Sequence, residues 1–179
     1  MRIGIFTPQF SAGKELDTGI GVHYRDLAIG LKSSGCDVFV FHTPYDTFET
    51  NSWSFEDINI LTLGLESPII PNIKGMSFLF KTFKIFDFIE AYKLYSKTKS
   101  VFSELNEKKP FDIIEASSNR GVAFGVSTIK SRPPIFTRVS TTMRQVFASD
   151  TKTPYLNYRL AAHLEEKQIQ NSEYLITHT

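Results

Sequence analysis

The sequence lacks most of the features that mark secreted, metal-binding or membrane-spanning proteins. Its 179 residues include a single cysteine, Cys36, which leaves no partner for a disulfide or a thiolate metal site. No apolar run approaches the roughly 20 residues that cross a bilayer, and the first residues have the pattern of a strand, not of a signal peptide. A net charge of +1 gives no overall argument for a nucleic-acid partner. We therefore expect a cytoplasmic protein that binds no metal and no nucleic acid.

Basic residues are scarce in the first part of the chain and acidic residues are scarce in later parts, although the whole chain is nearly neutral. Residues 1–73 hold 4 basic and 9 acidic side chains, whereas residues 74–110 hold 8 and 4, and residues 120–179 again hold 8 and 4. This unevenness predicts a basic end or face, which would suit an anionic ligand or a membrane surface.

Strand-like and helix-like patterns alternate along the whole sequence. The expected strands are residues 2–6, 38–41, 59–63, 112–116, 135–139 and 173–177, with residues 43–53 as loop. The expected helices are residues 20–34, 76–107 as one helix or two, 120–130 and 154–171. Such alternation predicts one α/β domain over residues 1–179, a Rossmann-like three-layer α/β/α sandwich with a mainly parallel sheet.

Apolar spacing also predicts which helix faces are buried. The first helix has a stripe of Ile20, Tyr24, Leu27, Ala28 and Leu31, and Gly35 should end it. The helix at 120–130 should bury Val122, Ala123, Val126 and Ile129. The helix at 154–171 should bury Leu156, Leu160, Ala161 and Leu164 and place Glu165, Glu166 and Lys167 on its far side.

A glycine pair, Gly19 and Gly21, stands where the first helix begins. Free N–H groups at a helix start can receive an anion such as phosphate, although a turn that needs positive φ would also explain the pair. The dinucleotide fingerprint is absent, because the third glycine is missing and His42, not an acidic residue, ends the second strand. This argues against half of an NAD-dependent oxidoreductase.

Polar residues follow two later strands, at the edge where such sheets bind ligands. The first group is Glu115, Ser117, Ser118, Asn119 and Arg120, in which Ser118 or Asn119 could instead cap a helix. The second group is Arg138, Ser140, Thr141, Thr142 and Arg144. Arg138 lies in an apolar strand and needs an anion, either Glu115 of the neighbouring strand or a substrate phosphate. The hydroxyls could bind a sugar or finish a turn.

Four stretches in order resemble one family. They are R-I-G-I-F with T-G-I-G-V-H-Y-R-D-L-A-I-G-L-K-S-S-G-C-D-V-F-V-F, then P-F-D-I-I-E-A-S, P-P-I-F-T-R-V-S-T-T, and L-E-E-K-Q-I-Q-N-S-E-Y-L-I-T-H-T. Together they span essentially the whole chain and resemble the amino-terminal half of retaining glycosyltransferases of family GT4, which have the GT-B fold.

The resemblance implies an acceptor-binding domain that faces a second Rossmann-like domain across a cleft. That second domain binds the nucleotide sugar through an E-x7-E pair, and this chain does not contain it. By the resemblance, Gly19 and Gly21 contact the donor, and Arg138 could serve donor or acceptor. The implied acceptor-side residues are Ser117, Asn119, Arg120, Ser140, Thr141 and Arg144. The nucleotide sugar is a substrate, so no cofactor and no metal are expected.

Ser140 stands where many members of that family carry a histidine proposed to assist catalysis, so the catalytic residue is unknown. Retention by front-face attack, with the leaving diphosphate taking the acceptor proton, would not require that histidine. We expect the chain alone to be inactive. The alternative is a non-catalytic Rossmann-like module that binds a small anionic ligand.

The stretch from Lys74 to Lys99 is rich in lysine and phenylalanine. The resemblance implies an acceptor that is lipid-linked or belongs to a surface polysaccharide or O-antigen, and such enzymes often touch the inner face of the cell membrane. Exposed Phe with Lys suits interfacial binding to anionic lipid. A core helix with a solvated lysine face is the competing interpretation.

Overall fold

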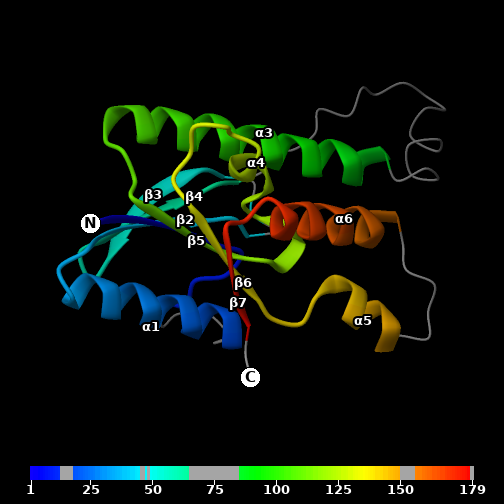
Figure 1. Cartoon of the computed structure of the whole chain (residues 1–179), viewed down its shortest axis with the longest axis horizontal. Helices are drawn as coiled ribbons and strands as arrows, with labels where there is room; N and C mark the ends of the chain where they lie inside the picture. Colours follow the sequence, from blue (N-terminus) through cyan, green and yellow to red (C-terminus); the bar gives the residue numbers. More distant parts are fainter. Residues whose placement is uncertain (13–17, 45–46, 48, 65–84, 150–155, 178–179) are drawn as a thin grey trace.

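The computed structural model describes residues 1–12, 18–44, 47, 49–64, 85–149 and 156–177. In this part of the chain a seven-stranded sheet is enclosed between helices on its two faces (Figure 1). The predicted Rossmann-like α/β/α architecture with a mainly parallel sheet is therefore confirmed.

The strands are β1 (Arg2–Thr7), β2 (Asp37–His42), β3 (Asn51–Phe55), β4 (Ile58–Thr62), β5 (Ile113–Ser117), β6 (Ile135–Val139) and β7 (Tyr174–Thr177). Their order in the sheet is β3-β4-β2-β1-β5-β6-β7, and every neighbouring pair is parallel except β3 with β4. The chain thus builds outward from β1 in one direction and then restarts on its other side with β5.

The helices are α1 (Gly19–Ser33), α3 (Ile85–Lys108), the 3-10 turn η1 (Asn119–Gly121), α4 (Phe124–Ser127), α5 (Met143–Ser149) and α6 (Leu156–Gln170). Figure 1 shows α1 on one face of the sheet and α3, α4 and α6 on the other. Residues 74–84 of the lysine-rich stretch lie outside the described residues.

Gly35 terminates helix α1 as predicted, and Thr18 caps its start. The Thr18 hydroxyl accepts the Gly21 N–H at 3.1 Å as the N-cap. At the other end, Gly35 has a φ of +83°, and its N–H donates to the Lys32 carbonyl while the Cys36 N–H donates to the Leu31 carbonyl. These two bonds form a Schellman motif, which glycine favours because only it adopts positive φ without a penalty.

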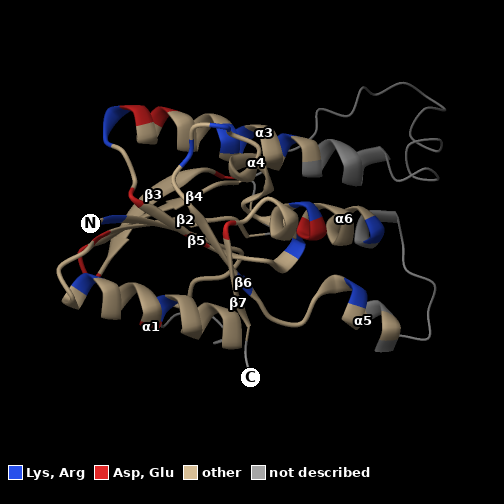
Figure 2. Ribbon diagram, viewed as in Figure 1, with Lys and Arg blue, Asp and Glu red and all other residues tan. Residues whose placement is uncertain are grey.

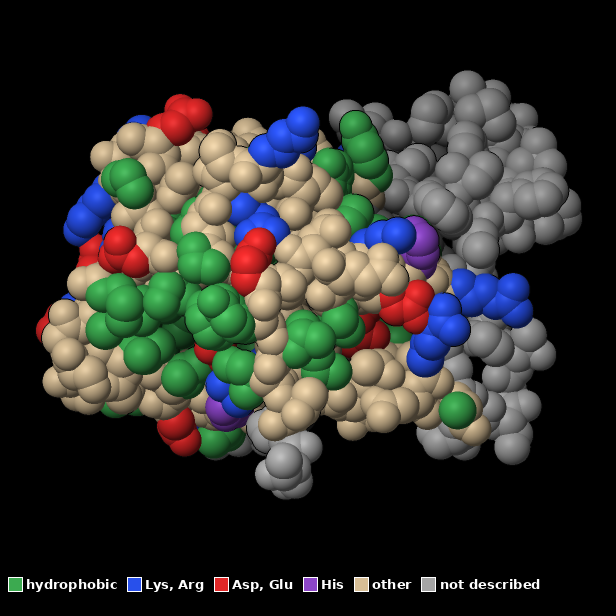
Figure 3. All heavy atoms as spheres, in the orientation of Figure 1, with side chains coloured by type: hydrophobic (Ala, Val, Ile, Leu, Met, Phe, Trp, Pro, Cys, Tyr) green, Lys and Arg blue, Asp and Glu red, His purple; other side chains and the backbone are tan. Residues whose placement is uncertain are grey.

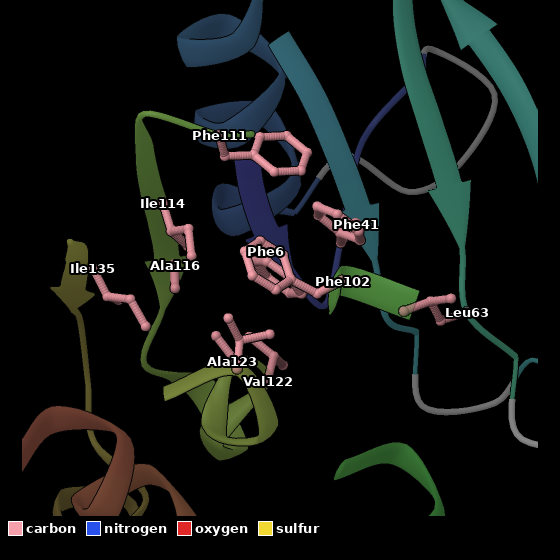
Figure 4. Close-up of a cluster of buried hydrophobic side chains, with 11 residues drawn as sticks. Phe6, Phe41, Leu63, Phe102, Phe111, Ile114, Ala116, Val122, Ala123 and Ile135 are labelled. Carbon is pink, nitrogen blue, oxygen red and sulfur yellow. The ribbon is translucent and has the colours of Figure 1, made fainter. Parts of the chain in front are cut away.

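Two apolar clusters hold the layers together. The first cluster lies between α1 and the sheet, where Tyr24 of α1 packs with Ile5 of β1 and Val40 of β2. On the opposite face Phe6 stacks on Phe41 with ring centroids 4.3 Å apart, and residues of α3, β5 and α4 complete the cluster (Figure 4). The apolar stripe of α1 and the face predicted for residues 122–129 both pack in these clusters, as expected.

Three sequence predictions are wrong. Residues 51–53 were expected in a loop, but residues 51–55 form the edge strand β3, which pairs with β4. The side chains of Trp53 and Phe55 point to the same face of the sheet and pack edge-on against Phe10. Helix α5 was not expected. The helix predicted for 120–130 is interrupted, because Arg120 and Gly121 have positive φ values of 53° and 68°.

The prediction for α6 is also wrong. Among its described side chains Ala162, Glu165 and Gln168 are buried, whereas Leu160, Ala161 and Leu164 are only partly buried, and the side chain of Leu156 lies outside the described residues. Glu165 does not face away from the core but is only 1% exposed, and Gln168 is fully buried beside it. Both side chains hydrogen-bond to loops that sequence periodicity cannot place.

The surface is mixed in character. Lys and Arg stand beside Asp and Glu on α3 and α6 (Figure 2), and Arg132, Arg138 and Arg144 each pair with a carboxylate. Much of the positive charge counted in residues 120–179 is thereby neutralised locally. Figure 3 shows hydrophobic side chains gathered on one face, and in β7 Tyr174 and Leu175 are each more than half exposed.

Candidate functional site

The sheet has its topological switch point between β1 and β5. From β1 the chain crosses by α1 to β2, and β5 then starts on the opposite side of β1. Loops that leave two such strands diverge to opposite faces, and this opens a crevice at their carboxyl ends where α/β proteins bind ligands. In the part of the chain that the structure describes, the residues concerned are 8–12 and 18, which lead from β1 to α1, and 118–123, which lead from β5 to α4.

The β1–α1 connection is tied down by local hydrogen bonds at both of its described ends. The Thr7 hydroxyl donates to the Gln9 carbonyl at 2.7 Å, and the Thr18 hydroxyl donates to Gln9 Oε1 at 2.5 Å. The Ser11 N–H donates to the Gly21 carbonyl at 3.3 Å. These bonds hold the first turn of α1 against the end of β1.

The two predicted donor glycines differ in what requires them. A Cβ on Gly21 would lie 2.5 Å from Ser11 Oγ and 3.2 Å from the Ser11 nitrogen, so packing of the loop on the helix accounts for that glycine. Gly19 is exposed, lies in right-handed helix, and a Cβ there would meet no atom of the described residues within 4 Å. Packing against the described residues therefore does not explain Gly19, which stands at the positive end of a 15-residue helix.

After β5 the chain makes a tight turn, so that Asn119 and Arg120 lie just beyond the carboxyl end of this strand. The Ser117 hydroxyl accepts the Asn119 N–H at 3.3 Å, and the Gly121 N–H donates to the Ser118 carbonyl at 2.8 Å. Ser118 stands at the N-cap of η1 but makes no side-chain capping bond, because its hydroxyl donates to Glu165 instead, so the capping alternative is wrong for Ser118. Arg120 has a φ of +53°, a conformation that non-glycine residues adopt at a cost and that clusters at functional sites.

Arg138 forms an ion pair with Glu115, its neighbour across β5 and β6. Nε of Arg138 donates to Glu115 Oε1 at 2.9 Å, and the two side chains are 17% and 13% exposed. The structural partner offered as one alternative for Arg138 is thus present. Burial raises the pKa of the Glu115 carboxyl above its ordinary value, although Arg138 opposes the shift.

Tyr24 reaches this pair from α1 and is almost fully buried. Its hydroxyl makes no hydrogen bond of normal geometry, although Ser117 lies near enough to influence it. Burial raises the pKa of Tyr24, the Glu115 carboxylate adds to the rise, and Arg138 and Ser117 oppose it. Tyr24, Glu115, Ser117 and Arg138 therefore form one polar cluster beside the carboxyl ends of β5 and β6.

The loop after β6 is organised by a capping box. The Thr142 hydroxyl accepts the Gln145 N–H at 3.3 Å, and Gln145 Oε1 accepts the Thr142 N–H at 2.8 Å, which starts α5. The signal T-M-R-Q was present in the sequence and would have revealed this helix. Ser140 is partly buried and Thr141 is exposed, while Arg144 pairs with Glu166 on α6.

Two residues that matter here were missed by sequence reasoning. Glu165 and Gln168 of α6 bond to the loops after β5 and β6. The Gln168 amide group accepts from the Ala123 N–H and donates to the Ser117 carbonyl, both at 2.8 Å. A charged residue within a helical run gives no sequence signal of burial, because its partners are far away in the chain.

Within the described ranges, no group of three or more His, Cys, Asp or Glu side chains gathers in a way that could hold a metal ion. None of the described helices combines the length and the apolarity needed to cross a bilayer.

No protein-family model matches the sequence, and a search of curated proteins gives no match. Solved structures do resemble the fold. A sucrose-phosphate synthase from Thermosynechococcus elongatus is 14% identical, with a TM-score of 0.62 over 97% of this chain and 41% of that protein. Arabidopsis thaliana UGT89C1 in complex with UDP is 15% identical, with a TM-score of 0.50 over 99% of this chain and 42% of that protein.

Both of these structures are glycosyltransferases with the GT-B fold. At this level of identity the likeness concerns the fold alone. The chain spans about two fifths of the length of each of these proteins.

Proposed function

We propose that this chain is the acceptor-binding domain of a retaining glycosyltransferase of family GT4. It works with a carboxyl-terminal domain that holds a nucleotide sugar through an E-x7-E pair. The proposal is supported by the fold, by the order of the sequence motifs and by the placement of the polar loops at the switch point of the sheet.

The observation that carries the proposal is Gly19. It is exposed at the start of α1, and neither its φ nor its packing against the described residues requires glycine. A missing side chain at a helix start lets the diphosphate of a donor approach the backbone N–H groups, where the helix dipole stabilises negative charge. In this role α1 stabilises the diphosphate as it leaves the sugar.

The acceptor lies against the loops after β5 and β6. In this assignment Ser117, Asn119 and Arg120 bind it from one side, and Ser140, Thr141 and Arg144 bind it from the other. The acceptor hydroxyl attacks the anomeric carbon from the face that the diphosphate leaves, and its proton passes to the departing diphosphate. This step needs no metal and no protein base, which is compatible with Ser140 at the position where many relatives have histidine.

The acceptor is a glycan that is lipid-linked or belongs to a surface polysaccharide, and the protein acts in the cytoplasm at the inner face of the cell membrane. The lysine-rich and phenylalanine-rich stretch from Lys74 to Lys99 supports this assignment.

The test uses the natural protein that contains this chain. Its sequence should continue for about one more domain and include the E-x7-E pair. Purified natural protein, its Gly19→Ala variant and a panel of nucleotide sugars are then assayed for transfer to membrane-extracted glycolipid, with the anomeric configuration of the product determined by NMR.

We expect transfer with retention, and we expect Gly19→Ala to lower kcat/KM by about tenfold or more without lowering the unfolding midpoint. If no nucleotide sugar supports transfer or binds, while a small anion does bind, the non-catalytic module takes the place of this proposal.

A further inference from the structure

Helix α6 places two buried polar side chains, Glu165 and Gln168, against the loops that follow β5 and β6. We call these two residues the α6 clamp. Glu165 is 1% exposed and Gln168 is fully buried. Burying a carboxylate costs free energy unless hydrogen bonds compensate, so the bonds that Glu165 makes indicate what it is for.

The Glu165 carboxylate joins two loops that are far apart in the sequence. Oε1 accepts a hydrogen bond from the Ser118 hydroxyl at 3.0 Å, and Oε2 accepts the Met143 N–H at 2.7 Å. Ser118 belongs to the loop after β5, and Met143 is the first residue of α5, directly after residues 140–142. One side chain thus fixes the spacing between the two loops.

Gln168 holds both sides of the first of these loops. Its Oε1 accepts the Ala123 N–H, and its Nε2 donates to the Ser117 carbonyl at 2.8 Å and to the Thr137 hydroxyl at 3.3 Å. A direct backbone bond from the Ser118 N–H to the Arg138 carbonyl, at 3.0 Å, links the same loop to the end of β6.

The loop held in this way contains one strained residue. Arg120 has a φ of 53°, which costs a non-glycine residue free energy and persists only where the surroundings enforce it. Gly121 adopts its φ of 68° without such a cost, but it packs tightly, since a Cβ there would lie 2.6 Å from the Leu164 carbonyl carbon of α6. The α6 clamp and the backbone of α6 hold the loop in this conformation.

We infer that Glu165 is a positioning residue that makes the loops 117–121 and 140–142 a single ligand-binding platform. The identity of the ligand rests on the proposed function: a glycan acceptor long enough to contact Arg120 on one loop and Thr141 on the other. Glu165 does not touch this ligand. It sets the distance between the residues that contact the ligand, because both loops are hydrogen-bonded to its buried carboxylate.

The test compares three variants of the 179-residue chain by amide hydrogen exchange. Glu165→Gln keeps both bonds, because its oxygen accepts the Met143 N–H and its amide donates to the Ser118 hydroxyl, which turns to accept. Glu165→Met is similar in length and keeps neither. Glu104→Gln removes a surface charge that pairs with Lys108 and serves as the control.

Glu165→Met should speed exchange of the Gly121 and Met143 amides together by about tenfold or more, while the Ile5 amide in β1 stays unchanged. Glu165→Gln and Glu104→Gln should leave all three within about twofold. Faster exchange at only one loop, an equal rise throughout the chain, or no rescue by glutamine would overturn the inference.

A second variant keeps the idea testable if Glu165→Met does not fold. Ser118→Ala removes only the bond to the loop after β5, yet a shared platform predicts faster exchange at Met143 as well as at Gly121. A change confined to Gly121 contradicts the platform.

A glycan microarray separates this inference from the proposed function. Wild-type chain and Glu165→Gln should bind the same glycans, and Glu165→Met should lose them by about tenfold or more in signal, as expected when a binding geometry is loosened. If wild-type chain binds no glycan, acceptor binding fails as the function, and the exchange measurements still decide the platform.

Discussion

The Arg138 guanidinium contacts a single carboxylate oxygen of Glu115 with two of its nitrogens, Nε at 2.9 Å and Nη2 at 2.8 Å. The pair spans β6 and β5 at the carboxyl half of the sheet and is mostly buried. Two charges in such a place stabilise each other only while both are present, because each would otherwise be desolvated alone.

Arg138→Met should therefore destabilise the protein by about 3 kcal/mol, since it leaves Glu115 buried without its cation. The double variant Glu115→Leu with Arg138→Met removes both charges and should lie within about 1 kcal/mol of wild type. Urea unfolding of the two variants measures this. Equal losses in the single and the double variant would show that Arg138 contributes by packing alone.

The pH dependence of stability should report the buried Glu165. The pKa of the Glu165 carboxyl is raised above its ordinary value of 4.5, mainly because the group is buried. Hydrogen bonds from the Met143 N–H and the Ser118 hydroxyl oppose this rise. Between 4.5 and the raised pKa the folded protein holds a proton that the unfolded chain has lost, so this contribution to stability falls as pH increases.

Glu165→Gln cannot titrate and removes that fall. The unfolding free energy of the variant minus that of wild type should therefore rise with pH above 4.5 and level off once Glu165 is ionised in both states. Urea titrations across this interval measure the difference. Glu115, whose pKa is also raised, is present in both proteins, so its contribution to the pH dependence cancels in the difference between their unfolding free energies. A difference that stays constant with pH would show that the pKa of Glu165 is not raised.

Two glycines should respond to alanine in opposite directions. Gly121→Ala forces a Cβ to 2.6 Å from the Leu164 backbone at a φ of +68°. The left-handed conformation alone costs roughly 1–2 kcal/mol, so we expect a loss above about 2 kcal/mol. Gly30→Ala, in an exposed turn of α1 with no atom in the way, should gain about 0.5–1 kcal/mol. Thermal unfolding of both variants checks the sign of each change.

Membrane association is the last prediction. In the described part of the lysine-rich stretch, Lys97 donates to the Thr50 hydroxyl and the Gly64 carbonyl, so it serves the fold, whereas Tyr92 is 68% exposed. We expect the chain to sediment with vesicles that contain anionic lipid, more weakly as salt is raised, and not with neutral vesicles. Lys97→Gln should weaken stability more than vesicle binding. Absence of binding to either vesicle type would rule out the membrane role for this chain.

The sequence by itself determined the features whose causes are local. Thr18 and Gly35 mark the ends of α1, because caps depend on residues within one turn. Apolar spacing predicted which residues of α1 and of 122–129 are buried, and the alternation of strands and helices predicted the architecture. The ligand-binding roles of Ser117, Asn119, Arg120, Ser140, Thr141 and Arg144 remain predictions. The fold places these residues from the end of β5 through η1 and from the end of β6 to the first turn of α5.

Only the tertiary structure decided the burial of Glu165, the partner of Arg138 and the positive φ of Arg120. The bonds of Glu165 reach residues 47 and 22 positions away, and Arg138 meets Glu115 across 23 positions. Periodicity states which face of an element is apolar, but it cannot state which distant loop offers a donor to a carboxylate. The packing of α6 under two loops supplies that information, because the bonds exist only once all three segments are assembled.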